Sequence, residues 1–236
     1  MPRGSTTLAL GIAVAVVVAV STGARAQHAS PIAAPPAPPS LVKLSPATTS
    51  AAVNGLLRDI KARANEDESL PLFARQRVKW LTARQRAGEL AIVLLNNPAG
   101  ANLDADALMA SGDADGQQVI AISGPRLARF LLDEGPTSAP FNRRQHNDFL
   151  LGLVHETVHL ERRQRADTQF GLDARLDEEV RAWRTVDLQV VRPLLKRHEP
   201  MNPRFVEADA AIRSCGDKEP CQPLRELLLP SERLRR

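Results

Sequence analysis

The chain has 236 residues, of which 43% are hydrophobic and 25% are charged, and its formal net charge is +4. Its basic side chains are interleaved with acidic ones and not with aromatic ones, which make up only 3% of the sequence. This pattern excludes the strongly basic, aromatic-lined surface that is typical of a nucleic-acid-binding protein.

The first 26 residues have the organisation of a secretory signal peptide. Arg3 supplies a basic start, an apolar run extends from Leu8 to Val20, and a small-x-small cleavage site ends at Ala26. The run is shorter than the roughly 20 residues that a membrane-spanning helix needs. We therefore expect cleavage after Ala26 and secretion, or release into the periplasm. The alternative is an uncleaved segment that keeps the protein at a membrane.

Residues 27–40 are rich in Pro and Ala, a composition that favours an extended linker and cannot build a core. Residues 41–236 are expected to form one domain, because this length suffices for a single hydrophobic core. Periodicity and turn signals predict helices over Thr48–Arg63, Pro71–Ala87, Ala105–Ala110 and Pro125–Asp133, strands over Glu89–Leu95 and Gln118–Ser123, and a turn at Asp113–Gly116.

The next stretch, Phe149–Leu160, carries the motif His-Glu-x-x-His within an apolar run. Helical spacing places His155 and His159 on one face, one turn apart, so that both imidazoles can bind one metal ion. A catalytic Zn²⁺ takes such ligands and keeps one coordination position for water. Glu156, beside the first ligand, is the candidate base for that water. The alternative is a buried helix that carries two histidines at this spacing for structural reasons.

A third ligand is predicted on the following helix, Leu172–Leu195, whose apolar residues recur every three or four positions. Glu179 follows Leu176 by three positions and precedes Trp183 by four, so it is expected to point into the apolar stripe. A buried carboxylate is costly unless it is paired or bound to a metal. Glu179 is therefore the candidate ligand. The alternatives are a pair with a buried Arg, or Glu178, expected on a solvated face, as the ligand after a small helix rotation.

The set His155, Glu156, His159 and Glu179 resembles the gluzincin branch of the zincin metallopeptidases, in which the third zinc ligand is a Glu on the next helix. The resemblance covers about residues 118–195. For the domain of residues 41–236 it implies a zincin-like α+β fold, mostly helical with a small sheet beside the active-site helix. It further implies Zn²⁺ held by the two histidines and Glu179, Glu156 as general base, and hydrolysis of peptide bonds.

The resemblance also implies an edge strand that runs along the cleft and pairs with extended substrate, and the strand Gln118–Ser123 is its candidate. One departure concerns the oxyanion of the tetrahedral intermediate. Members of the branch stabilise it with a downstream Tyr or His, and this chain contains no Tyr. His198 is the remaining downstream His and is the catalytic candidate, although its charged neighbours are also typical of a solvent-exposed position. Arg192 and Arg204 are the weaker alternatives.

The chain beyond Leu195 contains five prolines and is expected to be irregular. Its only two cysteines, Cys215 and Cys221, are expected to close a small disulfide loop in an oxidising compartment. Two free thiols in a reducing cell are the alternative.

Two functions from different classes follow from these observations. The first is an exported zinc-dependent metallopeptidase that cleaves peptide or protein substrates with a zinc-bound water activated by Glu156. The second is a non-catalytic exported protein that binds metal without turnover or keeps the helix for structure. The intact Glu156 favours the enzyme, because a pure metal binder needs no acid there, whereas the missing Tyr favours the second function.

Overall fold

A computed structural model of the chain describes residues 13–14, 46–96, 108–114, 116–132, 142–163 and 172–233. It is mostly helical with one small sheet, so the α+β class is confirmed. The predicted export signal, residues 1–26, lies outside the described residues apart from Ala13–Val14, and the predicted linker, residues 27–40, lies entirely outside them. Within the described ranges, no helix combines the length and the apolar character needed to cross a membrane.

Five elements lie close to their predicted positions. They are helix α1 (Pro46–Glu66), helix α2 (Leu72–Arg86), strand β2 (Leu90–Leu95), strand β4 (Gln117–Ser123) and helix α3 (Gly124–Leu132). In α2 the buried residues Ala74, Val78 and Leu81 follow helical spacing, as expected for one face turned to the core.

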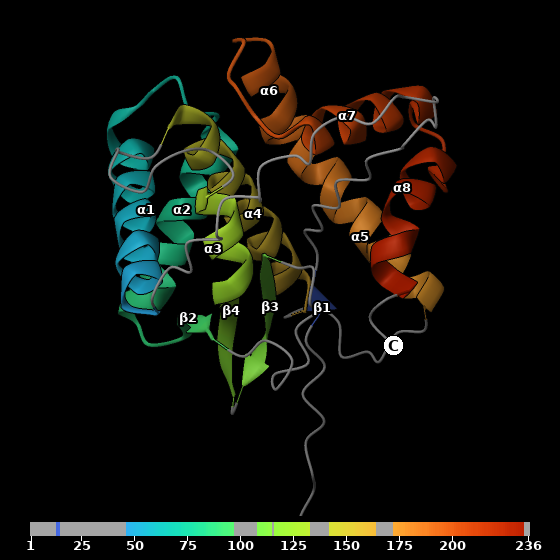
Figure 1. The fold of residues 1–236 in the computed structure, drawn as a ribbon. Coiled ribbons are helices and arrows are strands. Elements are labelled where there is room, and N and C mark those ends of the chain that lie inside the picture. Colours follow the sequence, from blue (N-terminus) through green and yellow to red (C-terminus); the bar gives the residue numbers. More distant parts are fainter. Residues whose placement is uncertain are drawn as a thin grey trace, which may run out of the picture.

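The sheet has the strand order β1-β3-β4-β2 (Figure 1), where β1 is Ala13–Val14 and β3 is Met109–Ala114. Strands β3 and β4 form a tight antiparallel hairpin, and Gly116 in its turn has φ 81°, a conformation that favours glycine. On its other side β4 pairs with β2 in parallel. The prediction that Gln118–Ser123 is the edge strand beside the site is therefore wrong, because β4 is internal. Strand β3 is the strand that contacts helix α4 (Arg143–Arg163), which carries the two histidines, and its outer side pairs with the two-residue β1.

The prediction of a short helix over Ala105–Ala110 is also wrong for the last residues of that range. Residues 105–107 lie outside the described part of the chain, but Met109 and Ala110 belong to β3. The sequence of β3 has small and polar residues with little preference for strands. Its pairing with β4 and the complete burial of Met109 outweigh this weak local preference.

Helix α4 (Arg143–Arg163) runs through the middle of the molecule and contacts α1, α2, β3 and α5 (Figure 1). Every side chain from Asn147 to Leu160 is buried, as in a helix that has no face turned to solvent. Gly152 brings α4 close to the sheet, because a Cβ atom at this position would lie 3.3 Å from Sδ of Met109.

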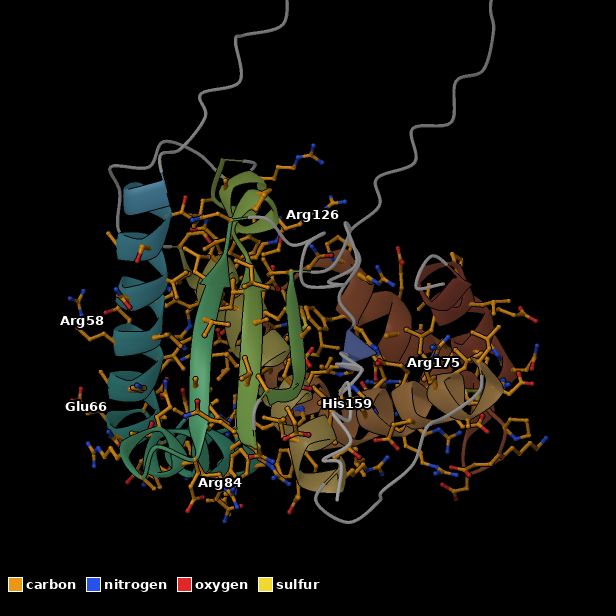
Figure 2. The ribbon with its side chains drawn as sticks, turned by 90° about the horizontal axis from the view of Figure 1, so that it is seen from below. Arg58, Glu66, Arg84, Arg126, His159 and Arg175 are labelled. Carbon is orange, nitrogen blue, oxygen red and sulfur yellow. A yellow bond between two sulfur atoms is a disulfide. The ribbon has the colours of Figure 1, made fainter. Side chains whose placement is uncertain are left out.

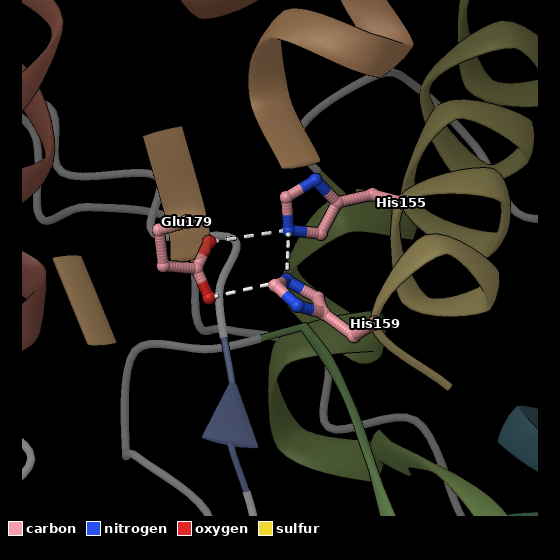
Figure 3. A group of neighbouring side chains, drawn as sticks. All are labelled: His155, His159 and Glu179. Atoms are coloured by element: carbon pink, nitrogen blue, oxygen red, sulfur yellow. Dashed lines mark hydrogen bonds and ion pairs between the residues drawn. The ribbon is translucent and has the colours of Figure 1, made fainter. Parts of the chain in front are cut away.

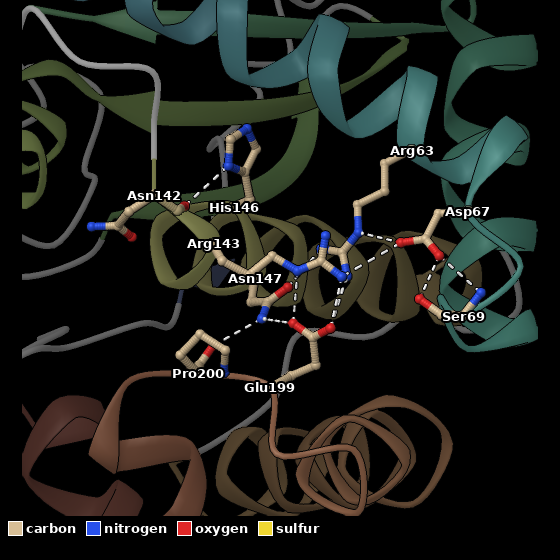
Figure 4. A network of polar contacts seen from close by, with 9 residues as sticks. All are labelled: Arg63, Asp67, Ser69, Asn142, Arg143, His146, Asn147, Glu199 and Pro200. Atoms are coloured by element: carbon tan, nitrogen blue, oxygen red, sulfur yellow. Dashed lines mark hydrogen bonds and ion pairs between the residues drawn. The ribbon is translucent and has the colours of Figure 1, made fainter.

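A network of polar contacts holds the N-terminal end of α4 (Figure 4). The buried Asn147 accepts a hydrogen bond from Arg63 (2.6 Å) and donates to the Glu199 carboxylate (3.1 Å) and the Pro200 carbonyl (2.8 Å). Arg143 donates two hydrogen bonds to Glu199, at 2.8 and 2.6 Å. These contacts join α1, α4 and the segment after α6, which are far apart in the sequence.

The network keeps two carboxylates ionised. Hydrogen bonding from Arg143, aided by Asn147, lowers the pKa of Glu199 to about 2. Hydrogen bonding from Ser69, with a contribution from Arg63, lowers the pKa of Asp67 to about 2. Both groups therefore stay charged, and the contacts stay formed, through the neutral and mildly acidic range.

The helix predicted over Leu172–Leu195 is one uninterrupted helical segment. It consists of α5 (Leu172–Val186), a π-helical turn η2 (Asp187–Val191) and α6 (Arg192–Leu195). Beyond it the prediction of irregular structure is wrong, because two further helices follow. They are α7 (Pro203–Cys215) and α8 (Gln222–Arg233).

Pro203 is compatible with a helix because of where it stands. Pro203 lies in the first turn of α7, where its missing N–H has no intrahelical partner to lose. Asn202 caps that turn by accepting a hydrogen bond from the Arg204 amide (3.0 Å). In α8 the helix continues through Pro230.

The disulfide between Cys215 and Cys221 is confirmed, with the two Cα atoms 5.5 Å apart. It joins the end of α7 to the start of α8. Helix α8 packs on α5, where Arg225 forms ion pairs with Asp173 and Asp177. Helices α5, α7 and α8 thus form a layer on the β3 side of the sheet, whereas α1 lies on the β2 side (Figures 1 and 2).

Candidate metal centre

Three side chains from two neighbouring helices meet in the interior (Figure 3). His155 and His159 come from α4, and Glu179 comes from α5, which packs against α4. Nε2 of His155 lies 3.2 Å from Oε2 of Glu179, Nε2 of His159 lies 3.2 Å from Oε1, and the two Nε2 atoms are 3.0 Å apart. Each residue is only 2% exposed, and Figure 2 places His159 between the strands and the C-terminal helices.

The periodicity of each helix explains this convergence. Residues four apart share a helix face, so the two histidines project together from α4. On α5, Glu179 belongs to the buried stripe that also contains Leu176 and Trp183, and this stripe faces the interior. The structure therefore brings together the three residues predicted as ligands.

The spacing of these atoms suits a tetrahedral zinc ion. Bonds of roughly 2.0–2.1 Å imply separations of about 3.3–3.4 Å between neighbouring ligand atoms. The observed separations of 3.0 and 3.2 Å are close to this value. The donor types also match, because two imidazoles and one carboxylate form a common ligand set of catalytic zinc, which leaves one position for water.

The electrostatics of the group favour a positive charge at its centre. Burial alone would lower the pKa of His159, but the charge of Glu179 and the proximity of Glu178 outweigh burial and raise it to about 10. Burial alone would raise the pKa of Glu179, yet the two histidines lower it well below its ordinary value. Both shifts mean that the cluster stabilises a cation among its members, and a divalent metal ion would provide that charge.

Glu156 lies next to this group and is completely buried. Neither of its carboxylate oxygens has a hydrogen-bond partner among the described residues. Its negative charge contributes to the raised pKa of His159, which shows that it lies within electrostatic reach of the ligands. A buried carboxylate without a partner is costly, so its presence beside three side chains that could hold a metal ion is a chemical feature that packing does not explain.

Two further side chains contact the histidines. Glu178 places Oε1 3.5 Å from Nδ1 of His159 and forms an ion pair with Arg162 (2.9 Å). The sequence interpretation puts Glu178 on a solvated face and misses this contact. The contact could have been inferred from Arg162, because this residue follows His159 by three positions and therefore lies on the same side of α4. The Trp183 ring lies 5.5 Å from the ring of His155.

The residues predicted to stabilise an oxyanion are placed differently from one another. His198 is exposed on the turn after α6, and the structure does not bring it together with the three ligands, so its catalytic role stays a prediction. Arg192 forms ion pairs with two aspartates at 2.8 and 3.0 Å. Burial lowers the pKa of Arg204, and nearby carboxylates, Glu179 among them, act in the opposite direction. Among His198, Arg192 and Arg204, Arg204 is thus the side chain that interacts electrostatically with Glu179.

Comparison with known proteins does not assign this chain to a family. No family model matches it, and no curated protein or solved structure does so either. What the molecule itself contains is a buried group, His155, His159 and Glu179, whose ligand atoms all lie within 4.8 Å of one another and could hold a metal ion.

Proposed function

We propose that this chain is an exported, zinc-dependent metallopeptidase of gluzincin type with a zincin-like fold. The observation that carries this proposal is the buried group of His155, His159 and Glu179 with the unpaired carboxylate of Glu156 beside it. Export is supported by the disulfide between Cys215 and Cys221, a bond that persists in oxidising compartments.

The side chains have distinct roles in this proposal. His155, His159 and Glu179 hold the ion, and their burial excludes competing solvent from the ligand atoms. Zn²⁺ bound in such a site lowers the pKa of water and polarises a carbonyl group. Glu156 accepts a proton from the attacking water and passes it to the leaving amine, which is the role of a general base that becomes a general acid.

An extended peptide is the substrate shape that the sheet suits best. Strand β3 contacts the site helix through Met109 and Gly152. Its outer edge pairs in the antiparallel sense with β1, where Ala13 is opposite Ser111 and Val14 opposite Ala110. This pairing supports a substrate that takes the place of β1 and adds its own main chain to β3, since a strand edge binds extended chains through backbone hydrogen bonds.

Arg204 is the better candidate than His198 for stabilising an oxyanion. Its guanidinium is half-buried and lies within electrostatic reach of Glu179, whereas His198 is exposed. Loss of one such donor typically lowers kcat about 10²–10³-fold.

Metal analysis and one isosteric substitution test the proposal. We expect the purified chain to contain about one zinc ion and to cleave peptides, and Glu156→Gln to abolish cleavage while it retains zinc, because Glu156 is not a ligand. The matched control is Glu161→Gln, which removes a carboxylate from the same helix that pairs with Arg77. It should leave cleavage intact. A chain that binds no zinc with its three ligands unaltered would contradict the proposal.

The second candidate function is a non-catalytic, metal-binding exported protein. The observation that favours it is the burial of the site, since each proposed ligand is only 2% exposed. This alternative predicts that the chain binds zinc tightly but cleaves no peptide in a diverse library. It also predicts that Glu156→Gln leaves the zinc affinity unchanged.

A further inference from the structure

We propose that Glu178 is a positioning residue of the metal site, which holds His159 by the ring nitrogen that faces away from the other ligands. The inference rests on the proposed metal site and assigns a role to a residue that supplies none of the three ligand atoms. Its basis is the placement of two consecutive glutamates of α5 on opposite sides of one imidazole.

The ring of His159 lies between these two carboxylates. Its Nε2 faces Oε1 of Glu179 at 3.2 Å, and its Nδ1 faces Oε1 of Glu178 at 3.5 Å. A neutral imidazole carries its single N–H on one nitrogen and a lone pair on the other. A carboxylate that accepts from Nδ1–H therefore leaves the lone pair on Nε2, where the candidate ion is to be bound.

Glu178 is itself fixed in place for this contact. Its second oxygen, Oε2, accepts from Nη1 of Arg162 at 2.9 Å, and Arg162 stands on α4 three positions after His159. Its first oxygen, Oε1, is buried, has no hydrogen-bond partner in the described ranges, and lies 3.5 Å from Nδ1 of His159. Arg162 thus orients one oxygen of Glu178 while the other is left for His159.

The first histidine is held in a different way. His155 has the Trp183 ring 5.5 Å from its own ring, and Trp183 stands one helical turn after Glu179. A change at Glu178 should therefore act on the metal through His159 and leave the packing of His155 unaltered.

Zinc affinity, measured by competition with a chromophoric chelator, tests this role. We expect Glu178→Ala to weaken zinc binding about 10–100-fold, as loss of a group that orients a ligating histidine does. Glu178→Gln should weaken zinc binding less than Glu178→Ala does, because the amide oxygen of Gln can still accept a hydrogen bond from Nδ1–H. Replacement of zinc by Co²⁺ provides a spectroscopic readout, and its visible absorption bands should shift in Glu178→Ala.

Arg162 allows a double-mutant cycle. Arg162→Gln should weaken zinc binding less than Glu178→Ala does, and it should have little further effect in the Glu178→Ala background, because Arg162 acts through Glu178. The control is Asp173→Asn, which removes one negative charge from the same helix at a side chain that is 92% exposed. It should leave the affinity and the Co²⁺ spectrum unchanged.

The outcomes separate this inference from the proposed function. If the unaltered chain binds neither Zn²⁺ nor Co²⁺, the metal site and this inference fail together. If it binds both, and Glu178→Ala and Glu178→Gln leave affinity and spectrum unchanged, the metal site stands and the positioning role is overturned. An equal loss in Asp173→Asn would also overturn it, since the effect would then be one of overall charge.

Discussion

Replacing Glu179 by Gln should remove most of the zinc affinity while it keeps the shape of the side chain. Each carboxylate oxygen of Glu179 lies 3.2 Å from one histidine Nε2, so the anionic group is central to the cluster. The amide of Gln has no charge and presents an NH₂ group to one of the two imidazoles. The substitution therefore removes a ligand and adds a donor where an acceptor is needed.

The size of the effect follows from the energetics of zinc sites. Structural zinc sites bind with about 10–16 kcal/mol, which is about 2.5–4 kcal/mol for each of four ligands. Loss of one ligand should therefore weaken binding about 10²–10³-fold. At a zinc concentration near 1,000 times the original Kd, the bound ion stabilises the fold by about 4.1 kcal/mol, and a 10²-fold loss leaves about 1.4 kcal/mol.

Thermal unfolding with and without zinc measures this difference. A loss of about 2.7 kcal/mol should lower the zinc-induced rise in Tm by about 5–10 °C for a domain of this size. The Tm of the metal-free Glu179→Gln variant serves as its own reference, which removes any effect on the fold itself. A zinc-induced rise equal to that of the unaltered chain would refute the reasoning, because Glu179 would then not be a ligand.

Three further predictions concern the scaffold. Asn147→Ala should lower the free energy of unfolding in urea by about 1–3 kcal/mol, since it removes one hydrogen bond each from Arg63, Glu199 and the Pro200 carbonyl, and a smaller loss would mean that water replaces the amide. The folded-state pKa of Glu199 is depressed from 4.5 to about 2, so its stabilising contribution is present above about pH 5 and lost as the pH falls toward 2. Glu199→Gln should flatten the dependence of unfolding free energy on pH in this range, and an unchanged dependence would exclude Glu199 as its source. Gly152→Val should cost about 1–3 kcal/mol in the same urea assay by pushing against Met109, and a neutral result would show that Met109 moves aside.

The parts of the fold and site that the sequence predicts well are those set by local periodicity. The apolar run around His155 and His159 defines a buried helix, and the stripe of α5 gives the direction of Glu179. Both depend on residues within a few turns of one another. For this reason the convergence of the three side chains could be predicted before the packing of α4 on α5 was known.

Features that depend on distant partners could not be predicted in this way. The order of strands in the sheet is set by pairing between separate segments, so the sequence does not tell that β4 is internal, or that β3 lies between β4 and the two-residue β1. The contact of Asn147 with Glu199 spans 52 positions. Glu178 is half-buried, and its partners Arg162 and His159 face it from another helix. Pro203 and Pro230 indicate irregular structure when read alone, yet Pro203 stands in the first turn of α7, and α8 continues through Pro230.

The complete burial of residues 147–160 of α4 has a consequence for how this protein would respond to random mutagenesis. From Asn147 to Leu160 no position faces water, so polar or bulky replacements there would reduce the yield of folded chain whether or not the residue takes part in chemistry. A mutational scan that measured only activity would find that substitutions are harmful at every position from Asn147 to Leu160. The spacing of the two histidines would not stand out from this background. If the amount of folded protein and its catalytic turnover were both measured for each variant, the few positions would stand out where the folded protein is still made but turnover is lost.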